Sequence, residues 1–360
     1  MVRRAAALFT MYLPSLFSAA LLFTAAWPLW AEEVPAVKAG ASFTATDTLN
    51  CGAEASTDAS ECLQGLSWIC APFSVTCETA EEGRGDWLMR FPSPRPVGNV
   101  KNDRCAMEWR MAKDQDGKPV KAPVVVVVHE SGRGMVAGRI FANGLRAYGI
   151  HTFLMHLPGY GARTPDVKPG IQEMLPAMQQ AVADVRRACD AVAALPFVDT
   201  ANTALLGISL GGFVTATVSG LDHGFDKVFI LLAGGNLPDV ILQGGKDAAK
   251  IRVMLEKAGV TEQMIKDKAR LIEPMRLAHR VDAASTWLFS GTKDEVVPPA
   301  CSLAFARAAR LDKHHIQLPV GHYTAAVMLP VILQQTADIM RGIITAGPAP
   351  AETDKKQTKY

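Results

Sequence analysis

Five consecutive valines, residues 124–128, constrain the fold of this chain more than any other feature. A β-branched run that is apolar at every position predicts a strand buried on both faces, in the middle of a sheet. Strand-like runs alternate with stretches of helical periodicity from about residue 120 to residue 344. This alternation predicts an α/β fold, with a mostly parallel central sheet of about eight strands and helices on both faces. The expected strands are 87–91, 104–111, 124–128, 152–157, 203–208, 227–233, 285–290 and 315–318.

A glycine-flanked serine stands where such a sheet places its chemistry, just after the carboxyl end of a strand. Residues 207–211 read Gly-Ile-Ser-Leu-Gly and follow the apolar run 203–206. The pattern G-x-S-x-G is typical of a sharp strand-to-helix turn that exposes a serine hydroxyl. The serine has a strained backbone there, and the glycines avoid collisions with the neighbouring strand and helix. We therefore predict that Ser209 is a nucleophile.

An acid and a base follow two later strands. Asp294 comes after the strand expected at 285–290, and His322 comes after the strand expected at 315–318. A serine hydroxyl needs a base to take its proton, and His322 is predicted for that role. Asp294 is predicted to hold the imidazole in the right tautomer. The neighbouring Glu295 is the alternative acid, but the usual spacing between the acid and the following Val-Pro pair favours Asp294.

The order of these three residues along the chain resembles that of the α/β-hydrolase superfamily. The resemblance covers roughly residues 86–344. It rests on the glycine-serine motif, on the segment G-x-x-D-x-x-V-P that contains Asp294, and on the Gly-His pair that contains His322. It implies an α/β-hydrolase fold and a serine hydrolase that works through a covalent acyl-enzyme intermediate.

The tetrahedral intermediate of such an enzyme needs two backbone N–H donors for its oxyanion. One is expected from Leu210, directly after the nucleophile. By resemblance the second comes from Ser131, in the His-Glu-Ser-Gly loop at 129–132. This loop is similar to that of dienelactone hydrolase relatives, which have Cys in place of Ser209, so their substrate does not carry over. The sequence resembles two other groups to the same degree. These are acetyl-xylan and related secreted carbohydrate esterases, and the catalytic domains of prolyl-oligopeptidase-type peptidases.

Three other residues are expected near the site. His129 is predicted to orient the oxyanion loop through hydrogen bonds. Glu130 and Tyr160 are candidates for contact with the substrate. Glu130 alternatively pairs with Arg133, and Tyr160 alternatively supports the loop in which it lies. The sequence shows no metal-ligand spacing and no phosphate-binding loop, so we expect neither a metal nor another cofactor.

Together these features predict a serine hydrolase that cleaves small-molecule carboxylic esters. An insert at 236–280, interpreted as two charged amphipathic helices, is expected to form a lid. A peptidase or amidase of the same fold is the alternative enzyme. A non-catalytic binding protein on a hydrolase scaffold is a second alternative, which the complete set of three residues disfavours. The formal net charge is only +2, without a basic tract, and this argues against nucleic acid as a partner.

The N-terminus predicts export. Arg3 and Arg4 precede an almost wholly apolar stretch that ends at Trp30, and Ala31 is a candidate cleavage site. We expect a signal peptide at 1–31 and a periplasmic or extracellular protein. The alternative is an uncleaved N-terminal segment that anchors the protein to a membrane.

Cysteine usage agrees with export, because five of the seven cysteines lie between residues 51 and 105. We expect a cysteine-rich extension with few regular elements at 32–85, cross-linked by two disulfides. A hydrolase domain is expected at 86–346, followed by a disordered tail at 347–360. The five cysteines are Cys51, Cys62, Cys70, Cys77 and Cys105.

Overall fold

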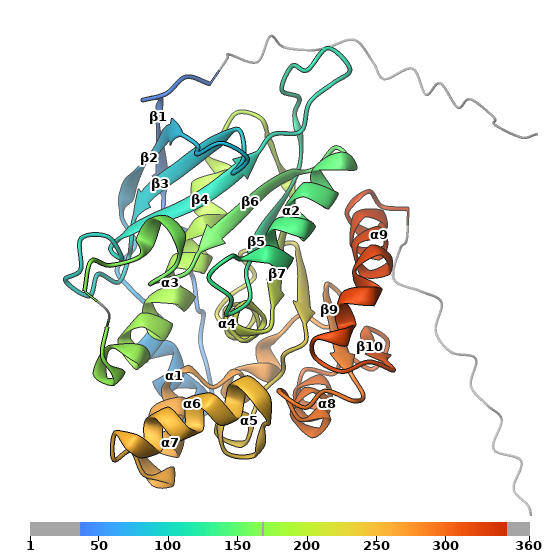
Figure 1. Cartoon of the computed structure of the whole chain (residues 1–360). Helices are drawn as coiled ribbons and strands as arrows, with labels where there is room; N and C mark the ends of the chain where they lie inside the picture. Colours follow the sequence, from blue (N-terminus) through green and yellow to red (C-terminus); the bar gives the residue numbers. More distant parts are fainter. Residues whose placement is uncertain (1–36, 168, 344–360) are drawn as a thin grey trace, which may run out of the picture. The chain divides into compact units, whose positions relative to one another are not determined.

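A ten-stranded sheet forms the centre of the computed structural model, which describes residues 37–167 and 169–343 (Figure 1). The strand order is β1-β2-β3-β4-β6-β5-β7-β8-β9-β10. The strands from β6 through β5 to β10 pair in parallel, and β1, β2, β3, β4 and β6 pair antiparallel. The strands are β1 Ser42–Thr46, β2 Pro72–Thr79, β3 Trp87–Pro92, β4 Arg104–Arg110, β5 Ala122–Val128, β6 His151–His156, β7 Val198–Ile208, β8 Lys227–Leu231, β9 Thr286–Gly291 and β10 His315–Leu318.

The valine run lies in β5, between β6 and β7 in the parallel part of the sheet. Side chains alternate along a strand, so the five valines face two different sides. Val124, Val126 and Val128 pack into one hydrophobic cluster, and Val125 and Val127 pack into the other. Both faces of β5 are therefore buried, and the predicted α/β class with a mostly parallel sheet is confirmed.

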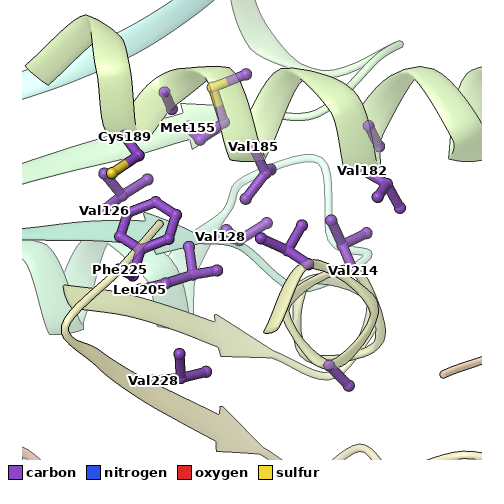
Figure 2. Packing of buried hydrophobic residues seen from close by; sticks show 14 of the residues in the cluster. Val126, Val128, Met155, Val182, Val185, Cys189, Leu205, Val214, Phe225 and Val228 are labelled. Atoms are coloured by element: carbon purple, nitrogen blue, oxygen red, sulfur yellow. The ribbon is translucent and has the colours of Figure 1, made fainter. Parts of the chain in front are cut away.

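Helices cover both faces of the sheet (Figure 1). Residues of α2 and α9 belong to the cluster on one face, and residues of α1, α3, α4 and α8 belong to the cluster on the other. Figure 2 shows the cluster that includes α3 and α4, where Val185 of α3 and Val214 of α4 lie near Val126 and Leu205 of the sheet. The helices are α1 Thr57–Leu66, α2 Val136–Ala147, α3 Met174–Ala193, α4 Leu210–Ser219, α5 Leu237–Gln243, α6 Lys246–Lys257, α7 Glu262–Ala269, α8 Pro299–Ala308 and α9 Leu329–Met340.

Some sequence predictions concern residues that the structure does not describe. The predicted signal peptide or anchor and the predicted tail at 347–360 lie outside the described residues. Within 37–167 and 169–343, no helix is long and apolar enough to cross a membrane.

The N-terminal region differs from its prediction as a separate extension with few regular elements at 32–85. This region contributes β1, α1 and β2, and β2 pairs with β3 of the main sheet, which raises the strand number above the expected eight. In β2, Phe73, Val75 and Cys77 are buried at alternate positions. Ser56 caps α1 by accepting a hydrogen bond from the backbone N–H of Ala59. Both signals are present in the sequence, but the polar composition of the region obscures them.

Polar contacts with α3 fasten this region to the rest of the protein. Asp47 forms an ion pair with Arg187, and both side chains are buried. Thr48 donates its hydroxyl to Asp190 at 2.5 Å. Removal of one partner from such a buried pair typically costs about 3–5 kcal/mol, because the other charge is left unpaired. We conclude that β1 is an integral part of the domain.

The predicted disulfides are absent, since all seven cysteines lie in the described residues as free thiols. Cys77 in β2 and Cys105 in β4 are separated by β3, which puts two strand spacings, roughly 10 Å, between them. A disulfide requires Cα atoms within about 7 Å. Burial raises the pKa of both Cys62 and Cys77 to about 11, so these thiols stay protonated at neutral pH.

The insert at 236–280 forms three α-helices, α5, α6 and α7, instead of the two predicted. Gly244 and Gly245 separate α5 from α6. A side-chain carbon on Gly244 would lie 2.4 Å from the carbonyl oxygens of Val240 and Val296, so only glycine allows this approach. Close packing against the segment after β9, which the sequence does not reveal, explains the additional break.

Candidate active site

Ser209 lies at the turn between β7 and α4. Its backbone has φ 52° and ψ −112°, a strained conformation for a residue with a side chain. A side-chain carbon on Gly207 would lie 2.3 Å from the oxygen of Gly211, and one on Gly211 would lie 2.3 Å from the oxygen of Val128. Glycine is therefore required at both flanking positions, for the steric reason that the sequence motif suggests.

The structure brings the three residues predicted for nucleophile, base and acid together. Ser209 Oγ lies 2.9 Å from His322 Nε2, and His322 Nδ1 lies 2.7 Å from Asp294 Oδ2. Each residue follows its own strand, β7, β10 or β9. When Nδ1 donates to the carboxylate, Nε2 of the neutral ring is free to accept the serine proton. This geometry can activate a serine hydroxyl for attack on a carbonyl carbon.

Asp294, and not Glu295, contacts the imidazole. The second carboxylate oxygen of Asp294 accepts hydrogen bonds from the backbone N–H groups of Val296 and Val297 at 2.8 and 2.9 Å. These bonds aim the other oxygen at His322. The side chain of Glu295 is 63% exposed and pairs with Lys246 at 2.5 Å.

Leu210 and Ser131, whose backbone N–H groups are predicted to bind the oxyanion, line the same pocket as Ser209. The N–H of Leu210 is the first in α4, and helix geometry gives such a group no acceptor within the helix. The N-terminus of α4 also carries a partial positive charge, which favours an anion. Ser131 lies in the wall of the same pocket as Ser209 and Leu210. The arrangement therefore suits stabilisation of an oxyanion close to the serine.

His129 holds the loop that carries Ser131. Its Nδ1 donates to the oxygen of Glu130 at 2.6 Å, and its Nε2 accepts from the backbone N–H of Leu157 at 3.1 Å. The bond accepted by Nε2 requires a neutral ring, and burial lowers the pKa of His129 to about 4. The carbonyl oxygen of His129 accepts from the N–H of Gly211 at 3.1 Å, which ties the loop to the nucleophile turn. These contacts match the predicted orienting role.

Glu130 and Tyr160, the two candidates for contact with a substrate, have hydrogen-bond partners within the protein. Both carboxylate oxygens of Glu130 accept backbone N–H groups at the start of α2, each at 3.1 Å, where a negative charge is favourable. Tyr160 donates its hydroxyl to the carbonyl oxygen of Ser131 at 3.1 Å. Neither is among the described residues that line the pocket beside Ser209. Sequence alone cannot separate these roles, because both side chains are polar and lie in glycine-rich loops.

A largely apolar pocket of about 410 Å³ opens beside Ser209. Its size falls in the range of small-molecule sites, about 300–1,000 Å³. Five segments form its walls: the loop with Ser131, the start of α3, the nucleophile turn with α4, the insert with α5, α6 and α7, and the loop after β9. The apolar lining includes Leu175, Met178, Phe213, Ile251, Leu255 and Ile265.

The wall formed by α3 is a part of the site that sequence reasoning missed. The stretch 171–195 has the periodicity of a helix, but this pattern does not show that its first turns line a pocket. Continuous burial begins only at Gln180, while Met174 remains 39% exposed and lines the pocket. Two methionines in the first turns are a weak signal, since flexible thioether side chains suit both irregular cores and binding surfaces.

Comparison with known sequences places the chain near one family. The profile of the prolyl oligopeptidase family matches residues 174–322, a stretch that contains Ser209 and Asp294 and ends at His322. No curated protein sequence matches the chain.

Solved structures share the fold at low sequence identity. An acetyl xylan esterase from Paenibacillus sp. R4 has a TM-score of 0.58 and 17% identity, over 79% of this chain and 92% of that one. Acetyl xylan esterase 1 from Thermoanaerobacterium sp. JW/SL YS485 has a TM-score of 0.57 and 15% identity, over 78% and 92%. An acylaminoacyl peptidase from Pyrococcus horikoshii has a TM-score of 0.51 and 13% identity, over 77% and 49%. At these identities the likeness concerns the fold alone.

Proposed function

We propose that the chain is a serine hydrolase of the α/β-hydrolase fold and that it hydrolyses carboxylic esters that carry an apolar group; the family match and the shared fold support this. One observation carries this proposal. Ser209, which forms a hydrogen bond with His322 and through it is linked to Asp294, lines the apolar pocket, so an apolar group in the pocket brings its ester carbonyl close to Ser209 Oγ.

The proposed reaction is acyl transfer in two steps. His322 Nε2 takes the proton of Ser209 as Oγ attacks the carbonyl carbon, and the N–H groups of Leu210 and Ser131 bind the resulting oxyanion. The imidazolium, stabilised by Asp294, then donates its proton to the leaving alcohol oxygen, which leaves an acyl-enzyme. A water molecule that gives its proton to His322 attacks the acyl carbon, and collapse of the second intermediate releases the acid and restores Ser209.

The chemistry of the pocket favours an apolar ester over a peptide. Each buried CH₂ group of a substrate contributes about 0.8 kcal/mol to binding. A peptide would bury backbone N–H and C=O groups, and each one left without a partner costs about 1–3 kcal/mol. Few lining residues offer such partners. The polar residues of the pocket wall are Ser131, Gln172, Ser209, Asp247 and Lys268.

A peptidase or amidase activity is the second candidate, and the match to the prolyl oligopeptidase family favours it. The same three residues can cleave an amide if His322 protonates the leaving amine. Turnover of a p-nitrophenyl ester and a p-nitroanilide with the same acyl group separates the candidates. We expect the ester to be the better substrate by more than the ratio of their uncatalysed rates.

Covalent labelling tests the proposed nucleophile directly. A fluorophosphonate probe should modify Ser209 in the wild-type protein and leave Ser209→Ala unmodified. Ser74→Ala is the matched control, since Ser74 is an exposed serine of β2 whose hydroxyl forms a hydrogen bond with that of Ser42. A series of p-nitrophenyl esters from acetate to dodecanoate then measures turnover. Folded wild-type protein that neither takes the label nor cleaves any of these esters would refute the proposal.

We also propose that the protein acts outside the cytoplasm. The support is the basic and then apolar N-terminal sequence, with Ala31 before two glutamates. N-terminal sequencing of the protein from its native cells should start at Glu32. A protein that keeps its first residues in a membrane fraction would favour the anchor, and recovery from the cytoplasm would contradict export.

A further inference from the structure

The lid is fastened to the loop that carries the catalytic histidine. Tyr323, the residue after His322, donates its hydroxyl to Asp247 Oδ2 in the first turn of α6 at 2.5 Å. The Tyr323 ring meets the His322 ring edge-on, with centroids 5.6 Å apart. A single hydrogen bond thus joins the lid to the immediate neighbour of the base.

The same end of α6 also contacts the loop of the catalytic acid. Lys246 pairs with Glu295, the neighbour of Asp294, at 2.5 Å, and the N–H of Gly245 donates to the carbonyl oxygen of Glu295 at 2.6 Å. The Lys246 ammonium lies 5.3 Å from the centre of the Tyr323 ring, within cation–π distance. The start of α6 is therefore held from two sides.

The residues that follow in α6 form a wall of the pocket. Asp247, Ala248, Ile251 and Leu255 all line it. Ala248, Ile251 and Leu255 lie three and four residues apart, a spacing that places them on one face of the helix. Because a helix is stiff, the position of its first turn sets the position of this face. Contacts at Asp247 thereby control how closely Ile251 and Leu255 cover the pocket.

We propose that the Tyr323–Asp247 hydrogen bond is a latch that holds the lid over the apolar pocket and makes Tyr323 a determinant of acyl-chain selectivity. The inference rests on the proposed ester hydrolysis. An acetyl group extends by one methyl from the carbonyl carbon, whereas an octanoyl group extends by seven carbons and fills more of the pocket. Only the longer group therefore gains from a closed α6 wall.

The charges around the latch keep it formed at neutral pH. Burial and the bond to Asp247 raise the pKa of Tyr323 to about 12, so its hydroxyl remains a donor. The bonds from Lys250 and then from Tyr323 lower the pKa of Asp247, so its carboxylate remains an acceptor. Tyr323 is 49% exposed, so we expect the hydrogen bond to shift the balance between closed and open lid by only about fivefold.

Replacement of Tyr323 by Phe removes the latch and keeps the ring. The readout is the ratio of kcat/KM for p-nitrophenyl octanoate to kcat/KM for p-nitrophenyl acetate. We expect Tyr323→Phe to lower this ratio about fivefold. Tyr148→Phe is the matched control, because Tyr148 also donates its hydroxyl at 2.5 Å, to Gln334 of α9. A ratio in Tyr323→Phe equal to that of wild type would overturn the inference.

A double-mutant cycle tests whether the two residues act through one bond. Asp247→Ala should lower the ratio about as much as Tyr323→Phe, and the double variant should lower it no further. Asp247→Asn keeps an oxygen acceptor and should retain more of the ratio than Asp247→Ala. Fully additive effects would overturn the latch, because they would mean that the two side chains act separately.

Hydrogen exchange tests the latch without any substrate. In Tyr323→Phe, amide exchange should become faster in α6, Lys246–Lys257, and stay unchanged in α9, Leu329–Met340. If the wild type cleaves no ester while exchange in α6 rises, the proposed function fails and the latch stands. If the wild type cleaves esters but neither exchange nor ratio changes, the latch fails and the function stands.

Discussion

Replacement of Asp294 by Asn removes one negative charge from the active site while it keeps the shape of the side chain. Asn retains an oxygen to accept the N–H groups of Val296 and Val297, which lie 2.8 and 2.9 Å from Asp294 Oδ1. Its NH₂ group would then face His322 Nδ1, now 2.7 Å from Asp294 Oδ2. Nδ1 would have to accept, which moves the ring proton to Nε2, opposite Ser209.

The expected loss of activity follows from that tautomer. With a proton on Nε2, His322 cannot take the proton of Ser209, and no carboxylate stabilises the imidazolium. Loss of the acid with geometry intact lowers kcat by about 10⁴-fold in comparable triads, a barrier increase of roughly 5 kcal/mol. The retained hydrogen bonds should keep the free energy of unfolding within about 1 kcal/mol of wild type.

The assay is steady-state hydrolysis of p-nitrophenyl butyrate, with thermal unfolding measured on the same preparations. Glu295→Gln is the matched control, because it neutralises the adjacent, 63% exposed carboxylate, and we expect it to lower kcat less than tenfold. Wild-type activity in folded Asp294→Asn would refute the proposed role of Asp294. A 10⁴-fold loss in Glu295→Gln instead would assign the acid to Glu295.

Three further predictions concern stability and thiol reactivity. Gly211→Ala should lower the free energy of unfolding by at least about 2 kcal/mol, measured by chemical denaturation, because the new carbon would lie 2.3 Å from a backbone oxygen. Gly65→Ala is the control and should not destabilise the protein, since its new carbon would have no neighbouring atom nearer than 3.9 Å. Burial lowers the pKa of His129 from 6.5 to about 4, so between these pH values the unfolded state binds a proton that the folded state does not. As pH falls from 6.5 to 4, His129 should therefore lower the free energy of unfolding by roughly 3 kcal/mol. Denaturation of wild type and His129→Gln across that range checks this, since a variant with an equally steep pH dependence would contradict it. Native-state alkylation followed by mass spectrometry should modify exposed Cys70 and spare Cys105, whose thiol pKa is raised by full burial; a disulfide at Cys105 would contradict the structure.

Local sequence patterns were sufficient to predict the class of fold and the meeting of three distant residues. The valine run of β5 identified a central strand because its composition suits burial on both faces. Ser209, Asp294 and His322 were each recognised as the residue type that follows a strand. Since the carboxyl ends of parallel strands meet at one edge of a sheet, a correct strand assignment brings such residues together without knowledge of side-chain packing.

Features that depend on distance across the sheet were predicted poorly. The grouping of five cysteines between residues 51 and 105 suggested disulfides, but strand order separates Cys77 from Cys105 by an intervening strand. The two-residue period of β2 was present in the sequence, yet its pairing with β3 could not be read from it. Glu130 and Tyr160 were candidates for substrate contact, and the sequence did not reveal their hydrogen-bond partners on α2 and on the oxyanion loop.

The sequence by itself determined the chemistry proposed for this protein, because a nucleophile, a base and an acid are recognised by residue type, order and position after strands. Tertiary structure determined the size and lining of the pocket beside these residues. The pocket joins Leu175 of α3, Phe213 of α4, Ile251 of α6 and Val296 of the loop after β9, residues up to 121 positions apart (296 minus 175). No local pattern encodes the space between such segments, since its size and polarity arise only when the lid and α3 pack around the end of the sheet.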